Sequence, residues 1–340
     1  MNKEHFTETS QVLSRLIDLI ENEEAEANVR RFKNQILPDL DKNASKGLGD
    51  DLKGFFRYLD HIDITILSLD ITARTEQILG YATWLVDDKE YKRNTVKKRL
   101  SGLRKTWSLM GLSNPLAQDV MANDKLALIL RRAYARADQV KGVSAPALAK
   151  ITLQLAQYDE NVRYKALRDV TLINVGYDTM LRRSELVSLR IEDLDFEFNN
   201  VIVNKTKTNT SGEGELKHLT RTSIGLIERL LGAMGEPNTG FLFRPAATSG
   251  KFKATELLLD EYDVPRIYRA LYRQCRLNPS GISGHSPRVG ACQKMFEEGV
   301  PMPKIMMAGG WKSAAMPMRY GEKFELQSGA SANIAEIMKR

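Results

Sequence analysis

The stretch from Ile191 to Thr222, IEDLDFEFNNVIVNKTKTNTSGEGELKHLTRT, constrains the fold of this chain more than any other. Aromatic and acidic residues alternate at 195–198, an Asn-Asn turn pair follows, and residues 201–203 are β-branched. This order predicts a strand, a turn and a second strand, and a third strand is predicted at 215–220 after a loop with glycines at 212–214. The segment therefore forms one small antiparallel sheet.

Helical patterns surround this sheet and extend over the rest of the chain. Residues 147–190 and those from about 223 onward have helical periodicity, so the C-terminal half is expected to be an α+β domain. The N-terminal half is expected to be a helical bundle, with Gly47 and Gly49 interrupting the pattern. Its predicted helices cover residues 8–36, 50–60, 73–86, 92–105 and 122–136.

The length of the chain and one glycine- and proline-containing segment predict two domains. At 340 residues the chain is long enough for two. Gly142, Ser144 and Pro146 are typical of a connection, and they place a linker at 137–146. We expect a mainly helical domain at 1–136 and an α+β domain at 147–340.

Composition excludes several classes of protein. The two cysteines rule out a disulfide framework. No apolar run approaches the ~20 residues that cross a bilayer, and the first 30 residues lack a signal-peptide pattern. We expect a soluble cytoplasmic protein without membrane contact. Metal-ligand spacing is absent among the four histidines, so no metal or other cofactor is expected; they are His5, His61, His218 and His285.

The net charge of +7 is modest, so the position of the basic residues matters more than their sum. Residues 91–107 contain no acid, and Leu100, Leu103 and Trp107 recur at helical spacing. The remaining faces of this helix carry Lys92, Arg93, Lys97, Lys98, Arg99, Arg104 and Lys105. Contact with a phosphate backbone and plain solvent exposure explain them equally well. A second basic group consists of Arg131, Arg132 and Arg136. Because Asp138 lies close to it in the sequence, solvent exposure is the better explanation for this group.

Five motifs in the second half carry residues suited to phosphodiester chemistry. They are MLRRSEL at 180–186, KTKT at 205–208, GHSPRVG at 284–290, AGGW at 308–311 and MRYGEKF at 318–324. Taken singly, most are explained as surface arginines, a solvated lysine, a core tryptophan or a packed tyrosine. Taken together, they supply two arginines, a lysine, a histidine, an indole N–H and a phenol for one site.

Two of these motifs are expected at helix N-termini. Ser184 is expected to cap one helix, and Ser286 another with Pro287 at its first position. His285 then precedes a helix N-terminus, where anions are favoured, and Arg288 lies in the first turn. Because an arginine there opposes the helix dipole, it calls for an anionic partner such as phosphate.

The chemistry of phosphodiester cleavage explains why these residue types belong together. Its transition state spreads negative charge over the phosphoryl oxygens. Two permanently charged arginines could stabilise that charge in place of a metal. A tyrosine would be the nucleophile, with nearby cations favouring its phenolate, and a lysine would protonate the departing 5′-oxygen.

In chain order, these motifs resemble the tyrosine recombinase (phage integrase) family. The matching elements are Arg-x-Ser-Glu-Leu at 182–186, Lys207 after a strand, His-x-x-Arg at 285–288, Trp311 and Tyr320. The tryptophan points to the Cre-like branch, where many integrases have histidine instead. The resemblance covers roughly residues 120–340, and residues 70–113 are similar to the family's core-binding domain. Because Arg183 adjoins Arg182, the choice between the two depends on the three-residue spacing from Arg182 to Glu185.

The resemblance implies a reaction that needs neither metal nor ATP. Tyr320 attacks the scissile phosphate, which forms a 3′-phosphotyrosyl link and frees a 5′-hydroxyl, and Lys207 acts as general acid. Two such strand exchanges, through a four-way junction on a tetramer, complete recombination.

The same resemblance implies the other catalytic roles. Arg182 and Arg288 hold the non-bridging oxygens, and Trp311 donates to the phosphate. His285 assists proton transfer or orients the phosphate, and Glu185 supports the site.

Domains and partners are implied as well. The first domain binds the DNA core site, with residues 1–45 an extension of unassigned role, and both domains clamp duplex DNA. A final helix at 328–340 docks on a neighbouring subunit or on its own domain. The partner is double-stranded DNA with inverted-repeat sites, bound by a homotetramer that is monomeric when free. Bases are read by the basic helix or by the helix VPRIYRALYRQ, through Arg266 and Arg269.

Two other functions stay open. A type IB topoisomerase or telomere resolvase would use the same residues, although the chain length and the Cre-like tail favour recombination. A DNA-binding protein that has lost catalysis would not need the complete set of residues.

Overall fold

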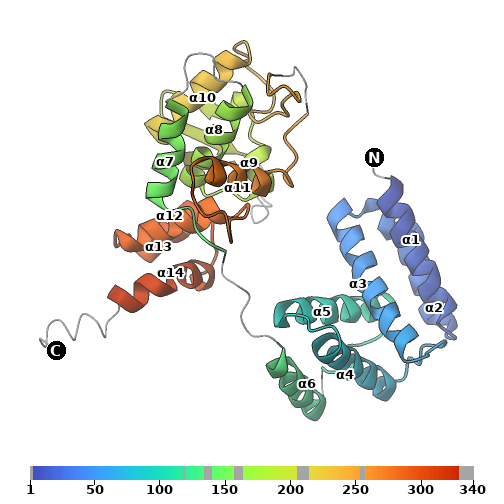
Figure 1. Cartoon of the computed structure of the whole chain (residues 1–340). Coiled ribbons are helices and arrows are strands. Elements are labelled where there is room, and N and C mark those ends of the chain that lie inside the picture. Colours follow the sequence, from blue (N-terminus) through green and yellow to red (C-terminus); the bar gives the residue numbers. More distant parts are fainter. Residues whose placement is uncertain are drawn as a thin grey trace, which may run out of the picture. The chain divides into compact units, whose positions relative to one another are not determined.

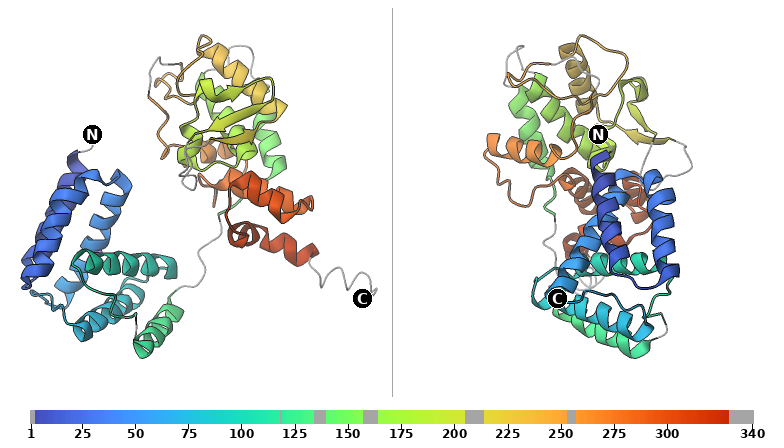
Figure 2. Two further views of the ribbon diagram at one scale, coloured as in Figure 1. Left: turned by 180° about the vertical axis from the view of Figure 1, so that it is seen from behind. Right: turned by 90° about the vertical axis from the view of Figure 1, so that its right-hand side faces the viewer.

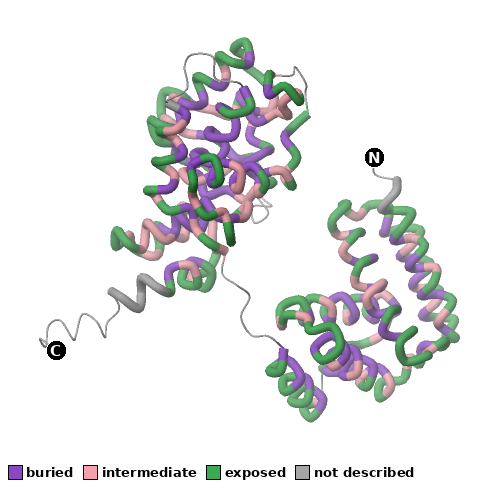
Figure 3. Tube along the Cα trace, in the orientation of Figure 1, coloured by how far each residue is buried: buried purple, intermediate pink, exposed green. Residues whose placement is uncertain are grey.

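The chain folds as two compact units, Met1–Ala137 and Asp138–Arg340 (Figure 1). The structure is a computed structural model. It describes residues 3–117, 119–133, 140–156, 164–204, 214–252 and 257–328, without the side chains of 3–5 and 323–328. Each unit has its own core of apolar side chains, and Figure 3 shows these buried positions on the inward faces of the helices. The first unit is helical and the second adds a small antiparallel sheet, so the predicted fold class is confirmed.

The N-terminal unit is built from six α-helices in its described part. They are α1 (Lys3–Asp18), α2 (Glu23–Arg31), α3 (Lys42–His61), α4 (Ile71–Asp87), α5 (Arg93–Leu109) and α6 (Val120–Arg132). Helix α3 packs against α1 and α5, and α4 packs against α5 and α6. Tyr81 of α4 and Trp107 of α5 are fully buried in this unit.

Two predictions for the N-terminal unit are wrong. The single helix expected at 8–36 is interrupted, because the Asn22 side chain accepts a hydrogen bond from the Ala25 N–H at 2.9 Å and starts α2 there. Gly47 and Gly49 do not break a helix, since α3 runs through both. A Cβ at Gly49 would lie 2.8 Å from Thr9 Oγ1, so this glycine permits the close approach of α1.

The C-terminal unit surrounds helix α8 with other helices. Its elements are α7 (Ala145–Ala156), α8 (Tyr164–Thr179), α9 (Arg183–Val187), β1 (Leu194–Asp195), β2 (Asn200–Val203), β3 (Glu215–His218), α10 (Arg221–Ala233), α11 (Val264–Gln274), α12 (Ser286–Glu297), α13 (Met302–Gly309) and α14 (Ala315–Ser328). Helix α8 packs against α7, α10, α11 and α12. Among the helices that the structure describes in both units, none has the length and apolarity of a membrane span.

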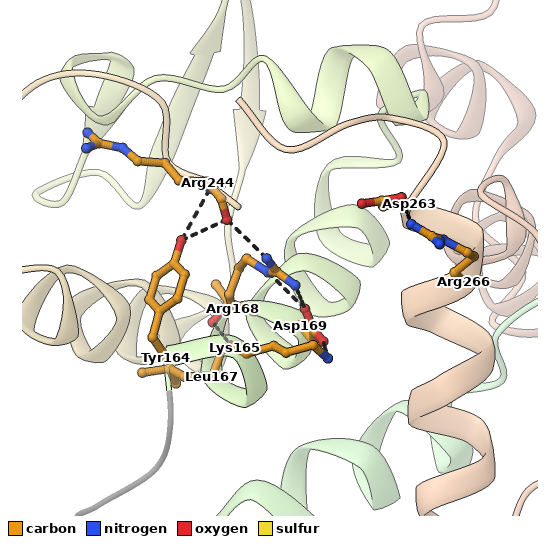
Figure 4. Close-up of polar contacts among 9 residues, drawn as sticks. Tyr164, Lys165, Leu167, Arg168, Asp169, Arg244, Asp263 and Arg266 are labelled. Carbon is orange, nitrogen blue, oxygen red and sulfur yellow. Dashed lines mark hydrogen bonds and ion pairs between the residues drawn. The ribbon is translucent and has the colours of Figure 1, made fainter. Parts of the chain in front are cut away.

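Polar side chains buried on α8 are satisfied within the unit. Arg168 Nε donates to Asp169 Oδ1 at 2.9 Å, and Arg168 Nη1 donates to the Arg244 carbonyl at 3.1 Å (Figure 4). The Tyr164 hydroxyl donates to the same carbonyl at 3.0 Å. Since a buried charge is tolerated only when it is paired and hydrogen-bonded, this network fixes the segment around Arg244 against α8.

The sheet has the order β1-β2-β3 and is antiparallel throughout (Figure 2). Val201 pairs with Leu194 on one side and with Lys217 on the other. The strand expected through Phe196 and Phe198 is wrong. Both residues lie in a turn and are exposed, because Asp195 Oδ1 accepts the N–H of Phe198 at 3.0 Å and ends β1.

Candidate active site

Segments distant in sequence meet around Arg288 on the C-terminal unit. The turn between α8 and α9 supplies Arg182, and the start of α12 supplies Arg288. The turn after α13 supplies Trp311, and α14 supplies Tyr320. The rings of Trp311 and Tyr320 pack against a small apolar cluster that includes Met180. The side chains from four of the five motifs therefore share one region of the unit.

Arg182 is fixed by Glu185, three residues further along the chain. The Arg182 N–H donates to Glu185 Oε2 at 2.9 Å, and Arg182 Nη1 donates to Oε1 at 2.8 Å. Glu185 is buried, whereas the Arg182 side chain keeps 25% of its surface exposed. The pair therefore leaves part of the guanidinium available to an anion. Ser184 was expected to cap this helix, but the cap is formed by the Glu185 carboxylate at the Arg182 N–H.

The neighbouring Arg183 has other partners. Its Nε lies 3.2 Å from Glu261 Oε2, and its Cζ lies 4.9 Å from the ring centroid of Tyr262. Glu261 and Tyr262 are far along the chain, and no local pattern in the sequence indicated them. Arg183 is thereby held by residues outside the five motifs.

Arg288 is the most buried cation of the region. It is 5% exposed, and its Nη1 donates to the Met180 carbonyl at 2.5 Å. Met180 has a φ of 53°, a left-handed conformation that is unfavourable for a bulky residue. It lies in the turn between α8 and α9. Burial, and then the positive charge of Arg182, lower the pKa of Arg288 to about 10. The guanidinium therefore stays charged at neutral pH and offers a buried positive charge to an anion.

His285 stands at the N-terminus of α12. Partial burial lowers its pKa, and the charges of Arg288, Arg183 and Arg182 lower it further. The imidazole is therefore neutral at neutral pH, so it has one proton acceptor and one donor. Ser286 was expected to be the N-cap, but it is the first residue of α12, and its hydroxyl accepts from the Ser283 N–H at 2.8 Å.

Trp311 follows the glycine pair that ends α13. Gly310 adopts the left-handed C-cap conformation with a φ of 62°, as a helix-ending glycine does. A Cβ at Gly309 would lie 2.1 Å from the Trp311 ring, so only glycine leaves room for the indole there. The ring lies 4.2 Å from Arg288 Cζ, which is a cation–π contact.

Tyr320 lies beside the indole, with 6.1 Å between the two ring centroids. Its main-chain carbonyl accepts from Gln293 Nε2 of α12 at 3.3 Å. Burial raises the pKa of Tyr320 more than the charges of Arg288, Arg319 and Arg182 lower it. The nearby arginines favour the phenolate, as expected, but burial outweighs them, so the phenol keeps its proton in the free protein. A proton acceptor is needed when the phenol attacks.

Lys207 lies outside the described residues, as does the helix expected at 328–340 apart from Ser328, the last residue of α14. A different lysine, Lys217 of β3, ties the sheet to the site. Its Nζ lies 2.5 Å from Glu215 Oε1 and donates to the Ala308 carbonyl at 2.8 Å. Lys217 is buried, and its hydrogen bond to Ala308 joins β3 to the end of α13, three residues before Trp311. No pattern in the sequence singled out Lys217.

The basic helix predicted at 92–105 is α5, with Lys92 as its N-cap. Lys97, Lys98 and Lys105 are exposed on it, as is Lys92, whereas Arg93, Arg99 and Arg104 are half-buried. Arg99 is engaged inside the unit, since its Nη1 donates to Asp51 Oδ1 at 2.9 Å. The lysines, rather than Arg99, therefore form the accessible positive surface of this helix.

The other arginines proposed to contact DNA have internal partners, with the exception of Arg131 among the described residues. Arg131 and Arg132 are exposed at the end of α6, and Arg132 lies 3.0 Å from Asp87 Oδ2. On α11, Arg269 Nη1 donates to the Ile282 carbonyl at 3.2 Å, and Arg266 pairs with Asp263 (Figure 4). Arg266 is 72% exposed, so its ion pair is a weak one that a phosphate could replace.

Comparison with known proteins gives the same family that the five motifs indicate. A family model described as "Phage integrase family" matches residues 150–326. Recombinase cre of Escherichia phage P1 is 27% identical over 297 residues, which cover 78% of this chain and 80% of the phage protein. An integrase/recombinase XerD homolog of Selenomonas ruminantium is 27% identical over 318 residues, which cover 90% and 89%.

Solved structures share the fold at low sequence identity. XerH recombinase bound to palindromic difH substrate, in a post-cleavage complex, matches with a TM-score of 0.61 and 11% identity, covering 98% of this chain and 97% of that one. The Tn1549 transposon integrase bound to transposon right end DNA matches with a TM-score of 0.59 and 16% identity, covering 90% and 99%. The resemblance seen in the five motifs is confirmed. The chain belongs to the phage integrase family of tyrosine recombinases, which are DNA breaking-rejoining enzymes.

Proposed function

We propose that this protein is a site-specific DNA recombinase with Tyr320 as its nucleophile. The observation that carries the proposal is the contact of Arg288 with both Met180 and Trp311, because it brings the motif residues of three segments to one buried positive charge. Tyr320 lies beside that charge. A phosphate placed there would meet the guanidinium groups of Arg182 and Arg288, which suits the charge that develops during phosphodiester cleavage.

The proposed step balances as a transesterification. The Tyr320 oxygen forms a bond to phosphorus while the bond from phosphorus to the 5′-oxygen breaks, which leaves a 3′-phosphotyrosyl link and a free 5′-hydroxyl. The phenol loses its proton with assistance from His285, whose lowered pKa keeps the imidazole neutral and able to accept. Lys207 supplies a proton to the leaving 5′-oxygen. The link keeps the energy of the ester, so rejoining needs no ATP.

Arg182, Arg288, Glu185 and Trp311 would act on the phosphate around this step. The two arginines would hold the non-bridging oxygens, and the indole N–H of Trp311 would donate to one of them. Glu185 would keep Arg182 in place through the hydrogen bonds already present.

The partner in this proposal is double-stranded DNA with inverted-repeat sites. The protein would assemble on it as a tetramer and exchange strands through a four-way junction, in the cytoplasm, on bacterial, plasmid or phage DNA. The N-terminal unit would contact the core of the site through the exposed lysines of α5. XerH and the Tn1549 integrase, which share the fold, have structures in complex with DNA.

A nicked suicide substrate tests the proposal. Inverted repeats flanking the gene serve as the target, and a nick near the scissile phosphate lets the 5′-hydroxyl strand diffuse away. The wild-type protein should form a covalent protein–DNA adduct that survives denaturing electrophoresis. Tyr320→Phe should form none while binding the same DNA equally well, and Tyr262→Phe, at an exposed tyrosine of the same unit, should still form it.

The same assay separates the alternatives. An adduct from Tyr320→Phe would show that another residue is the nucleophile. Binding without any adduct from the wild type would favour a DNA-binding protein that has lost catalysis. Adduct formation with relaxation of supercoiled DNA or closed hairpin ends, but without recombinant products, would favour a topoisomerase or a telomere resolvase.

A further inference from the structure

The N-terminal unit contains a cavity of about 550 Å³ between α3, α4 and α5. Its volume falls within the roughly 300–1,000 Å³ that small-molecule sites occupy. Four cationic side chains line it, Lys53, Arg57, Lys89 and Arg99, against a single acid, Asp50, among the described lining residues. The charge of its walls therefore suits an anion.

Tyr81 gives this cavity a hydrogen-bond donor that lacks an acceptor. Its side chain is fully buried, and its hydroxyl has no hydrogen-bond partner among the described residues. The rings of Phe55 and Trp84, with centroids 5.3 and 6.1 Å away, hold the phenol in place. Burial raises the pKa of Tyr81, so the phenol keeps its proton at neutral pH and can donate. A ligand oxygen would satisfy a donor that is otherwise unfavourable to bury.

Gly54 lets helix α3 pack closely on this hydroxyl. A Cβ at position 54 would lie 2.8 Å from Tyr81 Oη and 3.8 Å from Arg99 Cδ. Glycine within a helix destabilises the helix relative to alanine. Helix α3 therefore has an unfavourable residue at the position where a side chain would come too close to the Tyr81 hydroxyl.

The four cations differ in how far the protein itself engages them. Lys53 and Arg99 pair with carboxylates of the same unit. Arg57 and Lys89 have no carboxylate partner within the described ranges, and Lys89 Nζ lies 4.7 Å from the Trp84 ring centroid. Arg57 is exposed at the mouth, so its guanidinium fork is available to an oxyanion.

We propose that this cavity binds the phosphate group of a nucleotide, with Tyr81 donating to one phosphate oxygen and Arg57 pairing with others. A phosphate alone is far smaller than the cavity, so an attached sugar and base have room beside it. The phosphate belongs to a free nucleotide or to the backbone of bound DNA. In the second case the inference rests on the DNA binding proposed above, and in the first it does not.

Calorimetric titration of the full chain tests the free-nucleotide source. The probes are inorganic phosphate and deoxyadenosine 5′-monophosphate. Saturable binding of the nucleotide is expected, weakened about tenfold or more by Arg57→Gln and by Tyr81→Phe, because a hydrogen bond to a charged group is lost in each. Arg30→Gln, an exposed arginine of α2 outside the cavity, is the matched control and should bind as the wild type does.

Thermal unfolding of Tyr81→Phe distinguishes a hydroxyl that contacts the phosphate from one with a purely structural role. Because the hydroxyl has no partner, its removal should leave the melting temperature of the ligand-free protein unchanged or higher. Stabilisation of the wild type by the nucleotide should disappear in the variant. If the variant gains stability and keeps full nucleotide binding, the hydroxyl does not contact the phosphate and the inference fails.

Salt-dependent binding of a short duplex tests the DNA source. If the small probes do not bind, Arg57→Gln should still reduce the slope of log affinity against log salt concentration by about 0.9, the value for one lost phosphate contact. Arg30→Gln should not. The inference is overturned if neither probe binds and the two arginine variants have equal slopes. Adduct formation by the wild type, scored in parallel, shows whether the proposed function stands when this inference fails.

Discussion

The guanidinium carbon of Arg288 lies 4.2 Å from the ring centroid of Trp311. Arg288 comes from α12 and Trp311 from the turn after α13, so this contact joins two of the five motifs across a buried interface. The same guanidinium donates to the Met180 carbonyl in the turn before Arg182, which adds a third motif. Arg288 therefore organises the site as well as supplying its charge.

Substitutions of Trp311 should separate the function of its ring from that of its N–H. Trp311→His retains a ring N–H donor, whereas Trp311→Phe retains only an aromatic face over Arg288. If the N–H donates to the phosphate, Trp311→Phe should slow single-turnover cleavage of the suicide substrate by about 10²–10³-fold, the cost of one transition-state donor. Trp311→His should lose much less. Equal loss in both variants would assign the role to the indole ring and its packing.

Lysine substitutions at positions 182 and 183 should have different effects. Arg182 donates to Glu185, and its charge lowers the pKa of Tyr320, whereas Arg183 contacts Glu261 and Tyr262. Arg182→Lys loses a bidentate fork and should slow cleavage by about 10²-fold or more. Arg183→Lys should stay within a few-fold of the wild-type rate. If Arg183→Lys slowed cleavage more than Arg182→Lys, Arg183 would be the first catalytic arginine.

The pH dependence of cleavage should reflect His285. Its pKa is lowered in the folded protein, so the imidazole loses its proton below the ordinary value of about 6.5. Single-turnover cleavage should be constant near neutral pH and fall on the acidic side of that depressed pKa. His285→Gln should cleave more slowly without this acidic decline. A decline that persists in the variant would come from another group.

The sign of the stability effect follows from the same shift. Because the folded protein binds this proton more weakly than the unfolded chain does, protonation favours the unfolded state. The contribution of His285 to the free energy of unfolding is present above pH ~6.5 and decreases as the pH falls through that value. Urea unfolding of the wild type and His285→Gln at several pH values measures the difference.

Lys217→Met should destabilise the C-terminal unit. The substitution leaves the Ala308 carbonyl without its donor and Glu215 without its cation. Glu215 is 30% exposed and can be hydrated, so we expect a loss of about 1–3 kcal/mol in the free energy of unfolding, less than for a fully buried pair. Lys294→Met, at an exposed ion pair of α12, should change the free energy of unfolding much less. Equal losses of unfolding free energy in the two variants would show that the burial of Lys217 does not add to stability.

Local patterns in the sequence determined the class of fold and the order of the chemical groups. Helical periodicity located α4, α5 and α6 within a few residues, because each helix buries one face whose spacing is set by the helix itself. The glycine pair of the AGGW motif likewise determines the end of α13, since a glycine in the left-handed conformation terminates a helix locally. The family could be recognised because its motifs keep their order along the chain.

Only the tertiary structure decided which groups meet and in what ionisation state. The partners of Arg183, the acceptor of Arg288 at Met180 and the tie from Lys217 to Ala308 join residues far apart in sequence. Helix α3 continues through Gly49, where Thr9 of α1 packs against it, and local helix propensity could not predict this contact. Tyr320 keeps a raised pKa because its burial outweighs the nearby arginines. Contacts and desolvation depend on the folded environment, so the sequence supplied the reacting groups and the fold decided how they are arranged and charged.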